Sequence, residues 1–146
     1  MNSHFARASA LITAAPKKRR PIKRNFTPME HEEQVNLIQW AAHAACKYPP
    51  LRLLYAIPNG GNRHPVTAAK LKAEGVRAGV PDLCLPVPRG TYAGLYVELK
   101  RKQGGSVSEG QREWIHLLTL QGYRVEVCKG WEAARDVIVA YLESQP

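Results

Sequence analysis

Two apolar, strand-like segments, residues 82–87 and 93–100, are joined through the turn Pro88-Arg89-Gly90. So short a connection allows only antiparallel pairing, because a parallel neighbour needs a crossover of a dozen or more residues. A third strand-like segment, residues 123–128, follows a stretch long enough for a helix. It is expected to lie parallel to residues 93–100 through a right-handed crossover, which predicts a mixed β-sheet.

Helical segments precede and separate these strands. The first begins where Thr27 is a candidate N-cap and Glu30 completes a capping box. Tyr48-Pro49-Pro50 ends it, because a residue before proline avoids helical geometry. Residues 53–57 are interpreted as a short buried strand, and residues 65–74 as a short helix.

A second capping box, Ser108 with Gln111, begins a helix that runs to residue 121. Three of its apolar residues are expected to face inward: Trp114, Leu117 and Leu118. The last helix covers residues 131–142. The order is therefore αβαββαβα, an α/β fold in which helices cover both faces of a mixed β-sheet.

Positive charge is concentrated at the beginning of the chain. Residues 1–28 contain seven basic residues and no acidic one, out of 21 Lys and Arg and 12 Asp and Glu in the whole chain. Residues 29–146 are therefore nearly balanced and form the expected folded domain. Residues 1–28 are interpreted as a disordered basic tail, either in contact with a polyanion such as nucleic acid or simply solvated.

The sequence excludes one class of protein and argues against two others. No apolar run approaches the ~20 residues that a bilayer span requires. The three cysteines, Cys46, Cys84 and Cys128, are far apart and form no CxxC pair, which argues against a zinc ribbon or a disulfide scaffold. Buried thiols in a reducing, intracellular compartment fit this pattern.

Charged residues of types suited to catalysis occur on the predicted strand 93–100. Glu98 and Lys100 are two residues apart, so they project from the same face of the strand, about 7 Å apart at their backbones. Asp82 follows Pro81 at the start of the preceding strand, where antiparallel pairing can bring it beside Glu98. The alternatives are an ordinary exposed ion pair for Glu98 and Lys100, and a turn-forming role for Asp82.

Two neighbouring carboxylates repel each other unless a cation lies between them. Oxygen ligands of this kind suit Mg²⁺, which typically takes one or two carboxylates together with water and substrate phosphate. Asp82 and Glu98 are the candidate metal ligands, with the carbonyl of Leu99 as a third. Lys100 is placed to orient a water molecule, to offset negative charge in a transition state, or to help deprotonate that water.

The sequence Pro81-Asp82 followed by Glu98-Leu99-Lys100 resembles the PD-(D/E)xK signature of restriction-endonuclease-like nucleases. A wider, ordered set of motifs resembles the VRR-NUC family, the virus-type replication-repair nucleases. The set consists of Glu30-x₃-Gln34, Ile57-Pro58-Asn59-Gly60, the run from Gly75 to Asp82, Glu98-Leu99-Lys100 and Ser108-x₂-Gln111-x₂-Trp114. It covers about residues 29–142 and implies a restriction-endonuclease-like fold.

The resemblance also implies roles for individual residues. The metal-binding acids of the family fall on Asp82 and Glu98, and its catalytic lysine falls on Lys100. The acid of its first helix falls on Glu30, with Glu33 as the rival and helix capping as the alternative. Its following glutamine falls on Gln111, for which a capping-box role is the alternative.

The loop after the first strand is a candidate contact for DNA phosphates. Its free backbone N–H groups and nearby basic side chains suit such contacts, although an ordinary flexible turn is the alternative. The candidate residues are Asn59, Gly60, Gly61, Arg63, Lys70 and Arg77. The tryptophans are interpreted as core residues rather than as stacking platforms for bases: Trp40, Trp114 and Trp131.

The resemblance implies a Mg²⁺-dependent endodeoxyribonuclease, with Mn²⁺ as a possible substitute, that hydrolyses phosphodiester bonds. Stand-alone members of the family are typically viral or prophage-borne, act as homodimers and cut branched DNA such as four-way (Holliday) junctions. A bacterial or phage-infected cytoplasm is the expected location. The alternative function is a nucleic-acid-binding module that has a nuclease-like fold and no catalytic activity.

Overall fold

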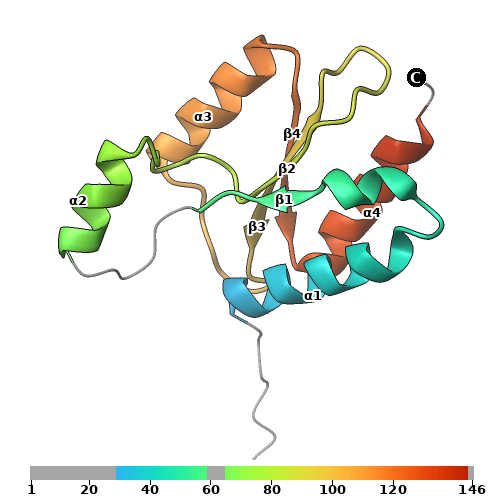
Figure 1. Ribbon diagram of the computed structural model, residues 1–146, viewed down its shortest axis with the longest axis horizontal. Helices are drawn as coiled ribbons and strands as arrows, with labels where there is room; N and C mark the ends of the chain where they lie inside the picture. The colour runs from blue at the N-terminus through green and yellow to red at the C-terminus, as the bar shows by residue number, and fades with distance from the viewer. Residues whose placement is uncertain (1–28, 59–64, 145–146) are drawn as a thin grey trace, which may run out of the picture.

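A computed structural model of the chain describes residues 29–58 and 65–144. The expected tail, residues 1–28, and four of the candidate DNA contacts, Asn59, Gly60, Gly61 and Arg63, lie outside the described residues. The elements are α1 (Glu30–Ala44), the 3₁₀ helix η1 (Pro49–Leu53), β1 (Tyr55–Ala56), α2 (Pro65–Ala73), β2 (Leu83–Leu85), β3 (Leu95–Lys100), α3 (Glu109–Leu120), β4 (Arg124–Lys129) and α4 (Trp131–Glu143). This sequence of elements confirms the expected αβαββαβα order (Figure 1).

The described strands form one mixed sheet in the order β1-β2-β3-β4. β2 pairs antiparallel with β3, as the short connection between them requires, and Leu83 lies opposite Val97. β4 pairs parallel with β3 along its whole length, after the crossover through α3. The expectation of a mixed sheet with one antiparallel and one parallel neighbour is therefore confirmed.

The hydrophobic core lies on the face of the sheet that α1 and α4 cover. On β3, alternate residues Leu95, Val97 and Leu99 are buried on this face, together with Ile138 and Tyr141 of α4. Figure 1 shows α1 and α4 on this side of β4 and α3 on the other. Residues 96, 98 and 100 of β3 therefore point to the α3 side, because side chains alternate along a strand.

The structure confirms a short strand within residues 53–57, but the prediction that this strand is buried is wrong. β1 contains two residues, both exposed, and Leu53 ends the 3₁₀ helix η1 with 55% of its surface exposed. Pro49 and Pro50 preset the backbone for this helical turn, which shortens the strand that follows. Among the described strands, β1 lies at the edge of the sheet and pairs with β2.

α1 begins later than the capping box at Thr27 predicted. Met29 is the N-cap, and the carboxylate of Glu32 accepts a hydrogen bond of 2.7 Å from its backbone N–H. Thr27 itself lies outside the described residues. The cluster of acids directly after Met29 decides the start, because a carboxylate three residues past the N-cap reaches the free N–H groups of the first turn.

α3 begins as predicted but packs less deeply. Ser108 is its N-cap, and its reciprocal hydrogen bonds with Gln111 confirm the capping box. The expectation that Leu117 faces inward is wrong, because 48% of its surface is exposed, whereas Trp114 and Leu118 are partly buried. Among the described residues, no helix is long and apolar enough to cross a membrane.

Candidate active site

Asp82 and Glu98 meet where β2 and β3 pair. Continued by one residue beyond the pair Leu83–Val97, the register puts Asp82 opposite Glu98, on the α3 side of the sheet. Pro81 is buried directly before Asp82. The Oδ2 atom of Asp82 accepts a hydrogen bond of 2.8 Å from the backbone N–H of Leu99, which holds the carboxylate beside β3.

Glu98 is a buried carboxylate with one satisfied and one unsatisfied oxygen. Only 1% of its surface is exposed. Its Oε1 atom accepts hydrogen bonds from Lys100 Nζ, at 2.7 Å, and from Gln111 Nε2. Its Oε2 atom is buried and has no hydrogen-bond partner among the described residues. A buried oxygen of this kind is costly unless a cation or water satisfies it.

The surroundings of Glu98 disfavour its charge. Burial raises the pKa of its carboxyl group from 4.5 to about 7, and the negative charges of Asp82 and Glu30 add to this, while Lys100 opposes it. Ionised Glu98 is therefore less favourable in the folded chain than in the unfolded one. Without a cation, this group stabilises the fold fully below pH 4.5 and loses that contribution as the pH rises through about 7.

Lys100 is the positive centre of the cluster. Its side chain is buried, and its Nζ lies 2.7 Å from Glu98 Oε1 and 3.9 Å from Glu30 Oε1. Burial of the ammonium group lowers its pKa, but the hydrogen bond and charge of Glu98, with Glu30 and Asp82, raise it above the usual value overall. Lys100 therefore holds its proton, which favours its role as a charged donor over the role of a base.

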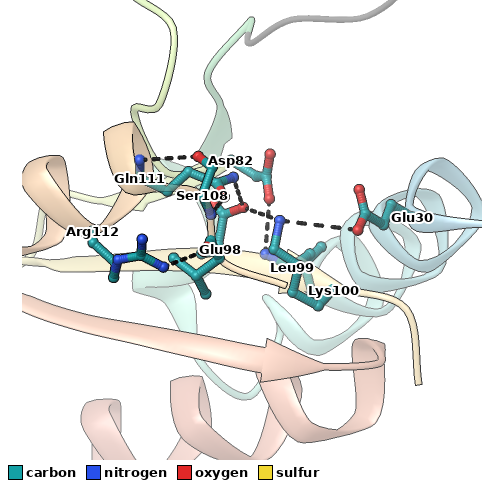
Figure 2. Close-up of polar contacts among 9 residues, drawn as sticks. Glu30, Asp82, Glu98, Leu99, Lys100, Ser108, Gln111 and Arg112 are labelled. Atoms are coloured by element: carbon teal, nitrogen blue, oxygen red, sulfur yellow. Dashed lines mark hydrogen bonds and ion pairs between the residues drawn. The ribbon is translucent and has the colours of Figure 1, made fainter. Parts of the chain in front are cut away.

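Gln111 makes the contacts of the capping box and also contacts Glu98, so its geometry is compatible with both alternatives that its position in the sequence left open. Its Oε1 atom accepts a hydrogen bond of 2.9 Å from the Ser108 N–H, and its backbone N–H bonds Ser108 Oγ at 3.3 Å. Its Nε2 atom donates to Glu98. The capping box of α3 thus fixes the glutamine whose amide orients a carboxylate of the site (Figure 2).

Glu30 and Glu33 lie in different surroundings although both belong to α1. Glu30 faces Lys100, as Figure 2 shows, and half of its side chain is exposed. Glu33 is fully buried, and its Oε2 accepts a hydrogen bond of 2.9 Å from the N–H of Trp131 at the start of α4. Glu33 therefore joins two helices, and Glu30 is the first-helix acid turned toward the cluster.

A divalent metal fits this donor set. Among the described residues there is no group of three or more His, Cys, Asp and Glu side chains able to hold a metal. Mg²⁺ does not require one, because it keeps several waters and binds through one or two carboxylates. Asp82 and Glu98 supply these carboxylates, and the buried, unsatisfied Oε2 of Glu98 is a ready ligand.

The candidate DNA contacts are only partly gathered. Lys70 lies on α2, highly exposed, with its Nζ 3.9 Å from Glu74 Oε1. Arg77 is also exposed, beyond the end of α2, and lines a pocket together with Val80 and Trp114. The structure therefore brings Arg77, but not Lys70, to the segment that leads into Asp82.

Trp114 lies next to the candidate site, a position that its interpretation as a core residue did not predict. It is only partly buried, and it lines that pocket from α3. One signal was available: Trp114 follows Gln111 by three residues, so the two side chains share one face of the helix. The glutamine assigned to the site therefore indicated the tryptophan as well.

Comparisons with known proteins agree with this arrangement. A family model described as the VRR-NUC domain matches residues 30–132, a range that contains all the residues of the cluster. A solved structure described as a VRR_NUC domain protein is 31% identical, covering 81% of this chain and 91% of its own, with a TM-score of 0.70. Among curated proteins, no match is found.

Proposed function

The chain belongs to the VRR-NUC domain family, a nuclease family, and from this premise we propose that it is a Mg²⁺-dependent DNA endonuclease that hydrolyses phosphodiester bonds. Its centre is the cluster of Asp82, Glu98 and Lys100. The observation that carries the proposal is the buried Glu98 carboxylate, with one oxygen held by Lys100 and Gln111 and the other unsatisfied. Among the buried carboxylate oxygens that have no partner in the described residues, that of Glu98 lies beside a second carboxylate, Asp82, and beside Lys100.

Each residue of the cluster has a part in hydrolysis. Asp82 and Glu98 hold the ion, which when bound supplies positive charge at the scissile phosphate and lowers the pKa of water. Lys100, kept protonated by its acidic neighbours, donates hydrogen bonds to the attacking water or the phosphate and offsets charge that develops in the transition state. Gln111 keeps Glu98 in position. Glu30, on the solvent-exposed side of the cluster, balances the charge of Lys100.

A finer proposal concerns the substrate and the assembly. Within this activity we assign branched DNA, such as a four-way junction, as the preferred substrate and a homodimer as the active form. Two copies related by a two-fold axis present two identical sites, which suits a symmetric junction. Size-exclusion chromatography with light scattering tests the dimer, and cleavage of junctions compared with linear duplexes of the same sequence tests the preference.

Cleavage is expected to depend on a divalent metal. Purified protein is incubated with labelled linear, flapped and four-way DNA in the presence of Mg²⁺, Mn²⁺ or EDTA. We expect product with Mg²⁺ or Mn²⁺ and none with EDTA, because both assigned ligands are carboxylates. Binding without product under every metal would instead favour a DNA-binding module without catalytic activity.

Removal of residues 1–28 is expected to weaken DNA binding and to flatten its dependence on salt. These residues carry seven basic side chains, and each phosphate contact contributes about 0.9 to the slope of log K against log salt on duplex DNA. The measurement is fluorescence anisotropy over a series of salt concentrations, with full-length protein as the control. A slope unchanged by the truncation would show that this segment makes no phosphate contacts.

A further inference from the structure

A pocket of about 380 Å³ opens beside the assigned catalytic cluster. Its walls come from the end of β1, the segment after α2 and the α3 helix. They are lined by Ile57, Pro58, Glu74, Gly75, Val76, Arg77, Val80 and Trp114. Pockets for small ligands begin at about 300 Å³, so this one has room for a single planar ring system.

Two chain connections tie the pocket to the cluster. Val80 stands two residues before Asp82, and the backbone N–H of Ile57 donates a hydrogen bond of 2.7 Å to the carbonyl of Asp82. On the opposite wall, Trp114 follows Gln111 by one turn of α3, and Gln111 bonds Glu98. The pocket is therefore bounded by the segment that leads into Asp82 and by α3, the helix whose Gln111 holds the Glu98 carboxylate.

Trp114 is held in place by a close contact between backbones. Gly79 has a φ of 89°, and a methyl group there would lie 2.9 Å from the carbonyl carbon of Gly110 and 3.0 Å from Cδ1 of Trp114. Only glycine at position 79 allows the start of α3 to approach this closely. The indole therefore packs at the pocket wall while remaining only partly buried.

We propose that this pocket receives a nucleobase, unstacked from the DNA strand, next to the phosphodiester that the enzyme cuts. Trp114 stacks on the base, Val76 and Val80 contact its edges, and Arg77 pairs with a neighbouring phosphate at the rim. The proposal rests on the nuclease activity proposed above, and it adds a binding subsite that favours DNA with unpaired or easily unstacked bases at the cut.

The chemistry of the lining favours a base over a peptide or a lipid. An indole with aliphatic neighbours matches the flat, apolar face of a base, which every nucleotide possesses. Arg77 supplies the positive charge that a phosphate requires. Glu74 is the one acidic residue in the lining, and its carboxylate pairs with Lys70 at 3.9 Å, so the rim does not repel a polyanion through an unpaired acid.

The test combines variants of Trp114 with DNA that lacks one base. Wild-type protein, Trp114→Ala, Trp114→Phe and the control Leu117→Ala, which changes an exposed apolar residue on the same helix, are compared on intact DNA. They are also compared on a series in which each nucleotide around the cut is replaced in turn by an abasic analogue. Binding is measured by anisotropy in EDTA, and cleavage in Mg²⁺ gives kcat and KM separately.

At one position near the cut, loss of the base is expected to weaken wild-type binding about tenfold, as loss of one stacked base does. The Trp114→Ala variant should bind intact DNA about equally weakly and should be insensitive to the abasic position, because both changes remove the same contact. Trp114→Phe should keep part of the sensitivity, and Leu117→Ala all of it. The effect should appear in KM rather than in kcat.

Three results would overturn the pocket assignment. One is a wild-type DNA-binding affinity that does not change at any position of the abasic series. This measurement requires no variant, so it decides the question even if Trp114→Ala does not fold. Another is independence of the two changes: if the affinity lost by Trp114→Ala on abasic DNA equals the product of the losses from the substitution alone and from the missing base alone, Trp114 supports the fold without touching the base. The third is an equal loss in Leu117→Ala. Because binding is read without metal, a wild-type protein that shows the base effect but never cleaves would refute the nuclease activity and leave the subsite standing.

Discussion

Replacement of Asp82 by Asn is expected to reduce the rate of DNA cleavage by at least about a thousandfold. The substitution removes one of the two carboxylates assigned to the metal, and the charge stabilisation that an ion gives a phosphoryl transition state amounts to several kcal/mol. The shape of the side chain is kept, and the amide oxygen can still accept the hydrogen bond from the Leu99 N–H. Single-turnover cleavage at saturating protein measures the loss.

The same variant is expected to fold at least as stably as the wild type in EDTA. The charge of Asp82 raises the pKa of Glu98, so removing it relieves a repulsion within the folded chain. Binding of DNA should change little, and any stabilisation of the wild type by Mn²⁺ in thermal melts should be lost. A variant that cleaves at the wild-type rate would show that Asp82 is not a ligand. A variant that is inactive because it is unfolded would reveal itself in the melt.

Replacement of Lys100 by Met is expected to reduce cleavage at neutral pH by at least about a hundredfold. Methionine approximates the length of the aliphatic stem but offers no positive charge and no donor to the attacking water or the phosphate. Losing one preorganised donor in an active site typically costs about 10²–10³ in rate. Lys100→Arg is the matched control, since it keeps the charge but alters the geometry, and it should recover only part of the activity.

The pH profile of Lys100→Met separates two contributions of the lysine. Lys100 lowers the pKa of Glu98, which is about 7 in the metal-free protein, so the variant should raise this pKa further and make protons compete more strongly with the metal for Glu98. More Glu98 is then protonated at pH 7, and part of the loss should be recovered as the pH rises above 8. The donor function is not restored by pH, so a deficit should persist at pH 9. Full recovery there would show that Lys100 acts only by keeping Glu98 ionised.

The central residues could be predicted from the sequence because strand geometry is periodic. Alternation alone placed Glu98 and Lys100 on one face, and the short turn before residue 93 made β2 antiparallel to β3, which brought Asp82 opposite Glu98. The capping box at Ser108 was also predictable from the sequence, because it depends on two residues that are three positions apart. Such local rules determine where side chains point before any tertiary contact forms.

Other features depend on tertiary contacts that no local pattern encodes. The exposure of β1 follows from its position at the edge of the described sheet, and α3 has no fully buried residue although it packs against β4. The choice between Glu30 and Glu33 depended on the position of α4, whose first N–H binds Glu33. Glu33 lies four residues before Leu37, which places it on the buried side of α1. The charge of Glu33 obscured this signal.

In the proposed mechanism, Gln111 links the start of α3 to turnover. Because one amide group closes the first turn of the helix and also bonds Glu98, fraying of that turn would release the carboxylate at the same moment. Helix ends open far more often than helix centres. The fraction of molecules competent for hydrolysis is then tied to a local opening equilibrium, so cleavage can decline on warming well before the β-sheet itself melts.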